Sequence, residues 1–175
     1  NDDVFSAWAT ILRGLPGSRL VMAGIPFGRF RDRLIGKLDA LGIDASRVDV
    51  RGYLKRDQFQ ALHHEVDIAL DSFPYNGGTT TCESLWMGVP VLSIAGQSTA
   101  GRTAISLLTA ARLTEWLVPD RDSYIRTACE RAADPLALSR LRRDMRQHLR
   151  ASPLMDGAAF AKSFEAALQS AWREW

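Results

Sequence analysis

The sequence predicts an α/β protein built on a doubly wound, Rossmann-like parallel sheet with helices on both faces and a helical C-terminus. Three observations lead to this fold class. Short apolar runs lack the in-and-out alternation of half-exposed strands, as expected for strands that are buried on both faces. Amphipathic segments separate these runs at the spacing of βαβ units. From residue 122 onward, helical patterns alone remain.

The apolar runs and the helical patterns alternate along the chain. Strands are predicted over 19–23, 48–50, 67–70, 89–94 and 116–118. Helices are predicted over 4–13, 30–41, 58–66, 80–87, 99–112, 123–133, 136–151 and 158–172, and prolines after Asp134 and Ser152 separate the last three. We therefore expect one domain over 1–175, with a Rossmann-like core over about 1–120 and C-terminal helices over about 121–175.

Composition excludes several classes of protein. With 175 residues, 46% of them hydrophobic and 24% charged, the chain suits one folded globular domain. A membrane partner is not expected, because no apolar run reaches the ~18–20 residues of a membrane span. A net charge of +2 gives no support for nucleic-acid binding. Cys82 and Cys129 suit no disulfide framework or zinc site, so we expect free thiols, no metal and a reducing cytoplasm.

The segment from Asp71 to Val91 carries the chemistry. It reads as strand, loop, helix and strand, and such a loop lies at the carboxyl end of a strand, where open α/β sheets bind ligands. Gly77 and Gly78 let the backbone approach a ligand closely. The threonines at 79–81 begin the helix, one of them as its N-cap, and place hydroxyls beside the free N–H groups of the first turn. This arrangement predicts an anion site that suits a diphosphate.

Glu83 adds a second group to this predicted site. It follows Thr79 by four residues and Thr80 by three, so all three share one helical face. A carboxylate beside a diphosphate suits the paired hydroxyls of a ribose, and the set predicts a nucleotide-sugar donor. A tight turn before a capped helix explains the glycines and threonines equally well when they are taken alone. Hydrolysis by Asp67 and Asp71 is disfavoured, because Asp71 is better suited to fix the loop through bonds to its backbone.

A longer stretch, 67–92, resembles the donor-binding segment of the SPINDLY and O-linked GlcNAc transferase family of GT-B glycosyltransferases. The resemblance extends over essentially all 175 residues and includes Trp8, the stretch 95–102 and the closing helix over 164–172. It implies that this chain is the C-terminal, donor-binding lobe of a larger protein. It also implies a parent that transfers GlcNAc, with inversion, from UDP-GlcNAc to Ser or Thr hydroxyls of an acceptor protein without a bound metal.

The resemblance assigns roles residue by residue. It implies diphosphate contacts from Thr79 and Thr80, with Gly77 and Gly78 in the same cradle, and a ribose contact from Glu83. Gly78 stands where animal members have a histidine, so that contact is absent here. The resemblance also implies a base-proximal place for Leu54 and Arg56 and a loop-supporting place for Asn76 and Arg102.

The same resemblance limits what this segment does by itself. The family's phosphate-binding Gln and Lys, its acceptor-binding first lobe and its tetratricopeptide repeats all correspond to positions before Asn1. We therefore expect the segment alone to be catalytically silent and catalytic residues to lie outside it. A nucleotide-binding or protein-interaction module without transfer activity remains the alternative, as does a transferase for UDP-glucose or GDP-fucose. We also expect Trp172 and Trp175 to be exposed without the first lobe.

Overall fold

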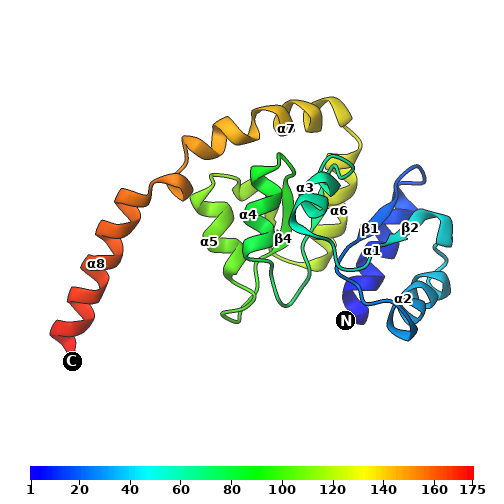
Figure 1. Ribbon diagram of the computed structural model, residues 1–175, viewed down its shortest axis with the longest axis horizontal. Coiled ribbons are helices and arrows are strands. Elements are labelled where there is room, and N and C mark those ends of the chain that lie inside the picture. Colours follow the sequence, from blue (N-terminus) through cyan, green and yellow to red (C-terminus); the bar gives the residue numbers. More distant parts are fainter.

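The computed structural model describes residues 1–175, and its strands and helices alternate as the sequence predicts (Figure 1). In chain order the elements are α1 (Asp2–Gly14), β1 (Leu20–Met22), α2 (Arg29–Ala40), η1 (Ala45–Arg47), β2 (Val48–Val50), α3 (Arg56–Leu62), β3 (Ala69–Leu70), α4 (Thr79–Trp86), β4 (Val91–Ile94), α5 (Thr103–Ala110), η2 (Thr114–Trp116), β5 (Leu117–Val118), α6 (Arg121–Ala132), α7 (Pro135–Arg150), η3 (Pro153–Met155) and α8 (Gly157–Glu174).

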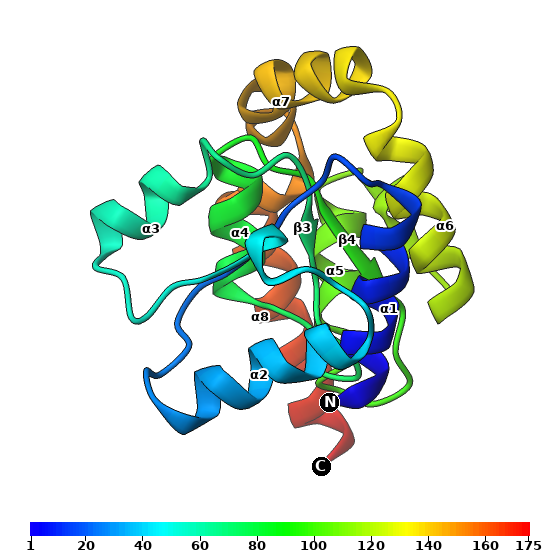
Figure 2. The same ribbon diagram turned by 90° about the vertical axis from the view of Figure 1, so that its right-hand side faces the viewer.

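All strand pairs are parallel, and helices cover both faces of the sheet. Helices α1 and α6 lie on one side of β3 and β4, and α4 and α5 lie on the other (Figure 2). The predicted α/β class with helices on both faces is therefore confirmed. No helix combines the length and the apolar character that crossing a membrane requires.

The expectation of one continuous sheet is wrong. Backbone hydrogen bonds form a two-stranded sheet, β1–β2, and a separate three-stranded sheet in the order β3–β4–β5. No strand of one sheet pairs with a strand of the other. The two sheets are connected instead through α1, whose side chains pack into both apolar clusters. Ala7 and Ile11 of this helix belong to the larger apolar cluster, whereas Ala9 and Leu12 belong to the smaller one, and Trp8 packs against both.

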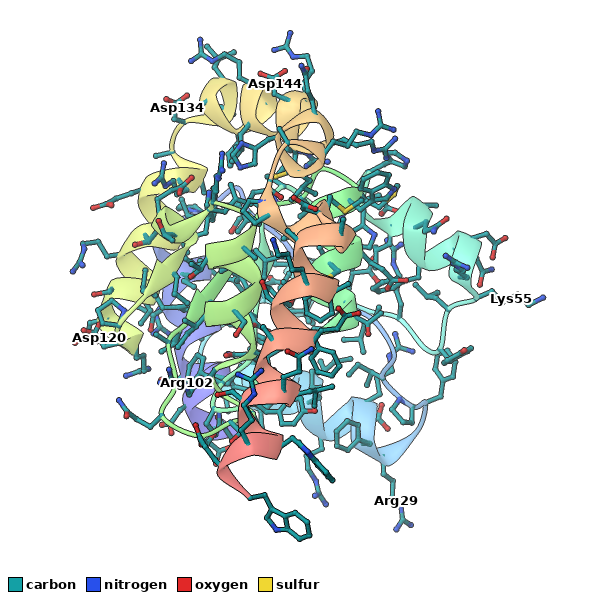
Figure 3. The ribbon with its side chains drawn as sticks, turned by 90° about the vertical axis from the view of Figure 1, so that its left-hand side faces the viewer. Arg29, Lys55, Arg102, Asp120, Asp134 and Asp144 are labelled. Carbon is teal, nitrogen blue, oxygen red and sulfur yellow. The ribbon has the colours of Figure 1, made fainter.

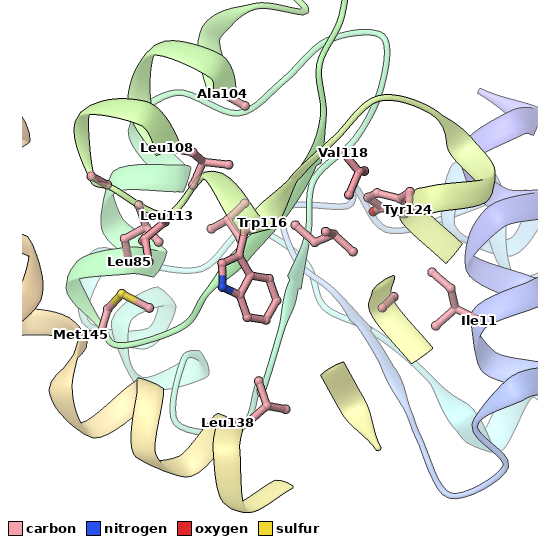
Figure 4. Packing of buried hydrophobic residues seen from close by; sticks show 14 of the residues in the cluster. Ile11, Leu85, Ala104, Leu108, Leu113, Trp116, Val118, Tyr124, Leu138 and Met145 are labelled. Carbon is pink, nitrogen blue, oxygen red and sulfur yellow. The ribbon is translucent and has the colours of Figure 1, made fainter. Parts of the chain in front are cut away.

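The larger cluster forms the main core, between the three-stranded sheet and helices α1, α5, α6 and α7 (Figure 4). Trp116 and Tyr124 are its largest fully buried side chains, and Met145 of α7 is also fully buried in it. Complete burial of side chains of this size stabilises a fold by about 1.5–3 kcal/mol each. The core therefore holds the carboxyl ends of β3 and β4 in fixed positions.

Two predicted helices are shorter in the structure than the sequence pattern indicates. The helix expected over 58–66 ends at Leu62, and a turn follows. The helix expected over 99–112 begins only at Thr103, because 96–101 form a tight loop in which the Gly96 N–H donates to the Gly101 carbonyl at 2.8 Å. A Cβ atom on Gly96 would lie 2.7 Å from that carbonyl oxygen, so the close approach requires glycine.

Helix α8 projects from the rest of the molecule (Figure 1). None of its residues is buried. Trp172 and Trp175 are 76% and 97% exposed, which confirms the expectation that both are exposed. Its first turn is nevertheless well formed, because the Asp156 carboxylate accepts from the Ala159 N–H at 2.9 Å.

Candidate functional site

The loop between β3 and α4 is held by a half-buried carboxylate, that of Asp71. One oxygen of Asp71 accepts from the Gly77 N–H at 2.8 Å, and the other accepts from the Ser93 hydroxyl at 2.6 Å. This confirms the prediction that Asp71 fixes the loop through its backbone. Burial raises the pKa of Asp71, and the hydrogen bonds from Ser93 and Gly77 oppose that rise.

A second chain of hydrogen bonds ties the same strand end to α1 and α6. The Tyr124 hydroxyl donates to the Asp71 carbonyl at 2.9 Å, and the indole N–H of Trp8 donates to the Tyr124 oxygen at 3.4 Å. Burial raises the pKa of Tyr124, so its hydroxyl keeps its proton and remains a donor. The loop is therefore anchored by groups from three separate parts of the chain.

Asn76 lies at the centre of the loop and is buried. Its side-chain amide faces the carbonyls of Ser72 and Ile94, each at 3.4 Å, and its Oδ1 atom is buried without a hydrogen-bond partner. The Asn76 N–H donates to the Ala100 carbonyl at 3.1 Å, which joins the loop to the turn over 96–101. Arg102 follows that turn, but its side chain is exposed and hydrogen-bonds to nothing in the loop (Figure 3). In the structure, the backbone of this turn supports the loop.

The N-terminus of α4 is open. Its N-cap is Gly78, which has no side chain to cap the helix, so the expectation of a threonine N-cap is wrong. The N–H groups of residues 78–81 form no hydrogen bond within the chain, and the first intrahelical bond runs from Cys82 N–H to the Gly78 carbonyl. The helix thus begins with four free donors and the positive end of its dipole.

Two threonine hydroxyls and one carboxylate flank the first turns of α4. Thr79 and Thr80 are exposed, and neither hydroxyl is engaged in a hydrogen bond within the protein. Glu83 is half-buried one turn further along the same helix and forms no ion pair. Its carboxylate is therefore available to accept hydrogen bonds from a ligand.

The predicted base-proximal residues belong to the segment that follows β2. Leu54 is half-buried, and Arg56 is exposed at the start of α3. No hydrogen bond connects either residue to the loop over 71–78. The link between the two regions is made at the C-cap of α3, where His63 Nε2 lies 3.1 Å from the Ser84 hydroxyl of α4. Since His63 Nδ1 lies 2.8 Å from the Phe59 carbonyl, this nitrogen carries the proton and Ser84 donates to Nε2.

Sequence reasoning did not identify Ser93 and Tyr124 as parts of this region, and it left open whether His63 or His64 lies near it. Ser93 interrupts an apolar strand, and that polar position is the one local signal for a buried partner of Asp71. Tyr124 lies 53 residues from Asp71 and His63 lies 21 residues from Ser84, so only the tertiary structure brings these pairs together.

The chain is similar throughout to one family of proteins. The profile described as glycosyl transferase family 41 matches residues 1–164. A probable UDP-N-acetylglucosamine–peptide N-acetylglucosaminyltransferase SPINDLY of Petunia hybrida is 40% identical over 98% of this chain and 19% of its own length. The UDP-N-acetylglucosamine–peptide N-acetylglucosaminyltransferase of Caenorhabditis elegans is 25% identical over 96% of this chain and 14% of its own length.

A solved structure shows the same arrangement of elements. A mutant of the Thermobaculum terrenum O-GlcNAc transferase superposes with a TM-score of 0.90 and 35% sequence identity, over 98% of this chain and 33% of that chain. This chain therefore spans about a fifth of the length of its plant relatives and a third of the bacterial structure.

Proposed function

Because the chain belongs to glycosyl transferase family 41, we propose that it is the donor-binding half of a protein O-glycosyltransferase. The donor is UDP-GlcNAc and the acceptor groups are Ser or Thr hydroxyls of a protein. The names of the relatives, which are UDP-N-acetylglucosamine–peptide N-acetylglucosaminyltransferases, support this donor and a peptide acceptor. The observation that carries the proposal is the open N-terminus of α4, with four free N–H groups beside two unengaged threonine hydroxyls.

Each group has one task in the proposed mechanism. The N–H groups of residues 78–81 and the hydroxyls of Thr79 and Thr80 bind the diphosphate. As the bond between the sugar and UDP breaks, negative charge develops on the leaving diphosphate, and these fixed donors stabilise it. Glu83 accepts hydrogen bonds from the ribose hydroxyls. Asp71 touches no substrate: it positions Gly77, so that the cradle is already formed before the donor arrives.

This segment is proposed to bind the donor weakly and to transfer no sugar by itself. The donor site of the proposed parent is a cleft between two lobes, and this chain supplies only one of those lobes. We expect a UDP dissociation constant of about 1 mM, equivalent to about 4 kcal/mol. Transfer of GlcNAc to a peptide by the 175-residue chain would contradict the second part of the proposal.

A UDP titration followed by NMR or calorimetry tests the site. Replacing Thr79 and Thr80 together with alanine removes two hydrogen bonds to a charged group, each worth about 1.5–3 kcal/mol. Binding should fall by at least about a hundredfold, below detection. The matched control replaces the exposed Thr109 and Thr114 with alanine and should leave binding unchanged. Unchanged UDP binding by the first variant would refute the diphosphate assignment.

A further inference from the structure

The segments that follow β1 and β2 lie side by side. The Gly24 N–H donates to the Gly52 carbonyl and the Ile25 N–H to the Arg51 carbonyl, each at 3.1 Å. The Phe27 ring packs directly on Gly52, where a Cβ atom would lie 2.5 Å from the ring. These segments and the first turns of α2 and α3 occupy one side of the molecule (Figures 2 and 3).

This side presents aromatic rings to solvent. Phe27, Phe30 and Tyr53 are 72%, 56% and 90% exposed. The Arg31 guanidinium lies 5.7 Å from the centre of the Phe27 ring. Several large exposed rings on adjoining segments are typical of an interaction surface. We call this surface the basic-aromatic rim and define it by Phe27, Arg29, Phe30, Arg31, Tyr53 and Lys55.

The three cations of the rim, Arg29, Arg31 and Lys55, form no ion pair. Segments 24–33 and 51–57 contain six cationic residues and two carboxylates, Asp32 and Asp57. Only Arg51 forms salt bridges, with Asp49 and Glu65, and the other five cations have no ion-pair partner. The two segments together therefore carry a formal charge of +4, whereas the chain as a whole carries +2.

We propose that the basic-aromatic rim binds an acidic peptide segment that also carries aromatic residues. The proposal rests on the proposed function, in which the acceptor is a protein, and it assigns part of that acceptor's recognition to this chain. Carboxylates of the peptide complement the unpaired cations, and its apolar side chains pack on the exposed rings.

A peptide fits the rim better than a single-stranded nucleic acid does. Bases need free aromatic faces for stacking. Gly52 and Arg31 occupy the Phe27 ring, so that only Phe30 and Tyr53 of the three rings could stack on bases. Carboxylates at Asp32 and Asp57 also interrupt the positive charge that a phosphate backbone would follow.

Fluorescence anisotropy with a short fluorescein-labelled peptide of Asp, Glu and Phe around one Ser tests this proposal on the 175-residue chain without UDP. The test variant combines Arg29→Glu with Phe30→Ala. The matched control combines Arg140→Glu with Leu136→Ala, two exposed positions on α7. Tyr53→Ala tests the part of the rim that lies in segment 51–57. All these side chains are exposed, so folding should persist, and circular dichroism checks it.

We expect the Arg29/Phe30 variant to weaken peptide binding about tenfold, equivalent to about 1.4 kcal/mol. Tyr53→Ala should weaken it about threefold, and the control should stay within about twofold. A peptide with Asn and Gln in place of Asp and Glu should bind at least about tenfold more weakly. Equal losses in test and control variants, or tighter binding of an oligouridylate than of the acidic peptide, would overturn the proposal.

A UDP titration of the same variants separates this proposal from the proposed function. The Arg29/Phe30 variant should bind UDP as the unaltered chain does, while the Thr79/Thr80 variant should lose UDP and keep the peptide. Retention of UDP by the Thr79/Thr80 variant would therefore refute the donor site, and retention of the peptide by the Arg29/Phe30 variant would refute the rim.

Discussion

Replacing Gly77 with alanine tests how tightly the loop before α4 is built. A Cβ atom at this position would lie 2.7 Å from Thr81 Oγ1, 3.0 Å from Thr80 Oγ1 and 3.3 Å from Asp71 Oδ1. Thr81 is buried and its β-branched side chain has few alternative rotamers, so the contact cannot be relieved by rotation alone. The loop must therefore move.

The expected magnitude follows from these contacts. Overpacking at a close contact costs about 1–3 kcal/mol. Movement of the loop also weakens the hydrogen bond from the Gly77 N–H to the Asp71 carboxylate, and bonds of this kind contribute about 1.5–3 kcal/mol. Movement of the loop relieves part of the overpacking, so the two costs do not add in full. We therefore expect Gly77→Ala to lower the free energy of unfolding by about 2 kcal/mol. UDP binding should weaken at least about tenfold.

Urea denaturation measures the first effect, and UDP titration measures the second. Gly78→Ala is the matched control for stability, since the nearest atom to its Cβ would lie 3.8 Å away, in ordinary contact. Its unfolding free energy should stay within about 0.5 kcal/mol of the unaltered chain. The reasoning is refuted if Gly77→Ala is as stable as the unaltered chain or if both alanine variants lose stability equally.

Three further predictions concern stability. Burial raises the folded-state pKa of Asp71 above 3.8, so the stability that the protonated carboxyl contributes should be complete below pH 3.8 and should decline as pH rises through the folded-state pKa. Urea denaturation at a series of pH values should show this decline, and Asp71→Asn should remove the decline. Arg142 donates to the carbonyls of His63 and Val66, so Arg142→Ala should lower the free energy of unfolding by about 2 kcal/mol. Deleting residues 157–175 should leave the unfolding free energy within about 0.5 kcal/mol, because no residue of α8 is buried.

Each of these predictions has a clear contrary result. For Asp71, the opposite outcome is a stability that rises, relative to Asp71→Asn, as pH increases from 3.8. For Arg142, the comparison is Arg143→Ala at an exposed neighbouring position, and equal losses in both variants would show that the partly buried hydrogen bonds of Arg142 are unimportant. For α8, a large loss of stability on deletion would show that this helix packs against the domain in solution.

Local chemistry made the loop between β3 and α4, the proposed donor site, recognisable from the sequence. Gly77, Gly78 and the threonines occupy consecutive positions. Two glycines let the backbone come close to a ligand, and the helix start that follows them has free N–H groups, and both consequences follow from backbone geometry alone. Helix boundaries were less predictable. A threonine was expected as the N-cap of α4, but the preceding glycine takes that position, since the helix begins one residue earlier.

The sequence by itself determined the order of strands and helices, the α/β class and the glycine-threonine segment at which α4 begins, because each depends on neighbouring residues. Tertiary structure alone decided that the strands form two hydrogen-bonded groups, that Ser93 and Tyr124 anchor Asp71, and that two segments after β1 and β2 meet to form one charged aromatic surface. The physical reason is distance along the chain. Contacts between residues tens of positions apart arise only when the whole core packs, and no local pattern records them.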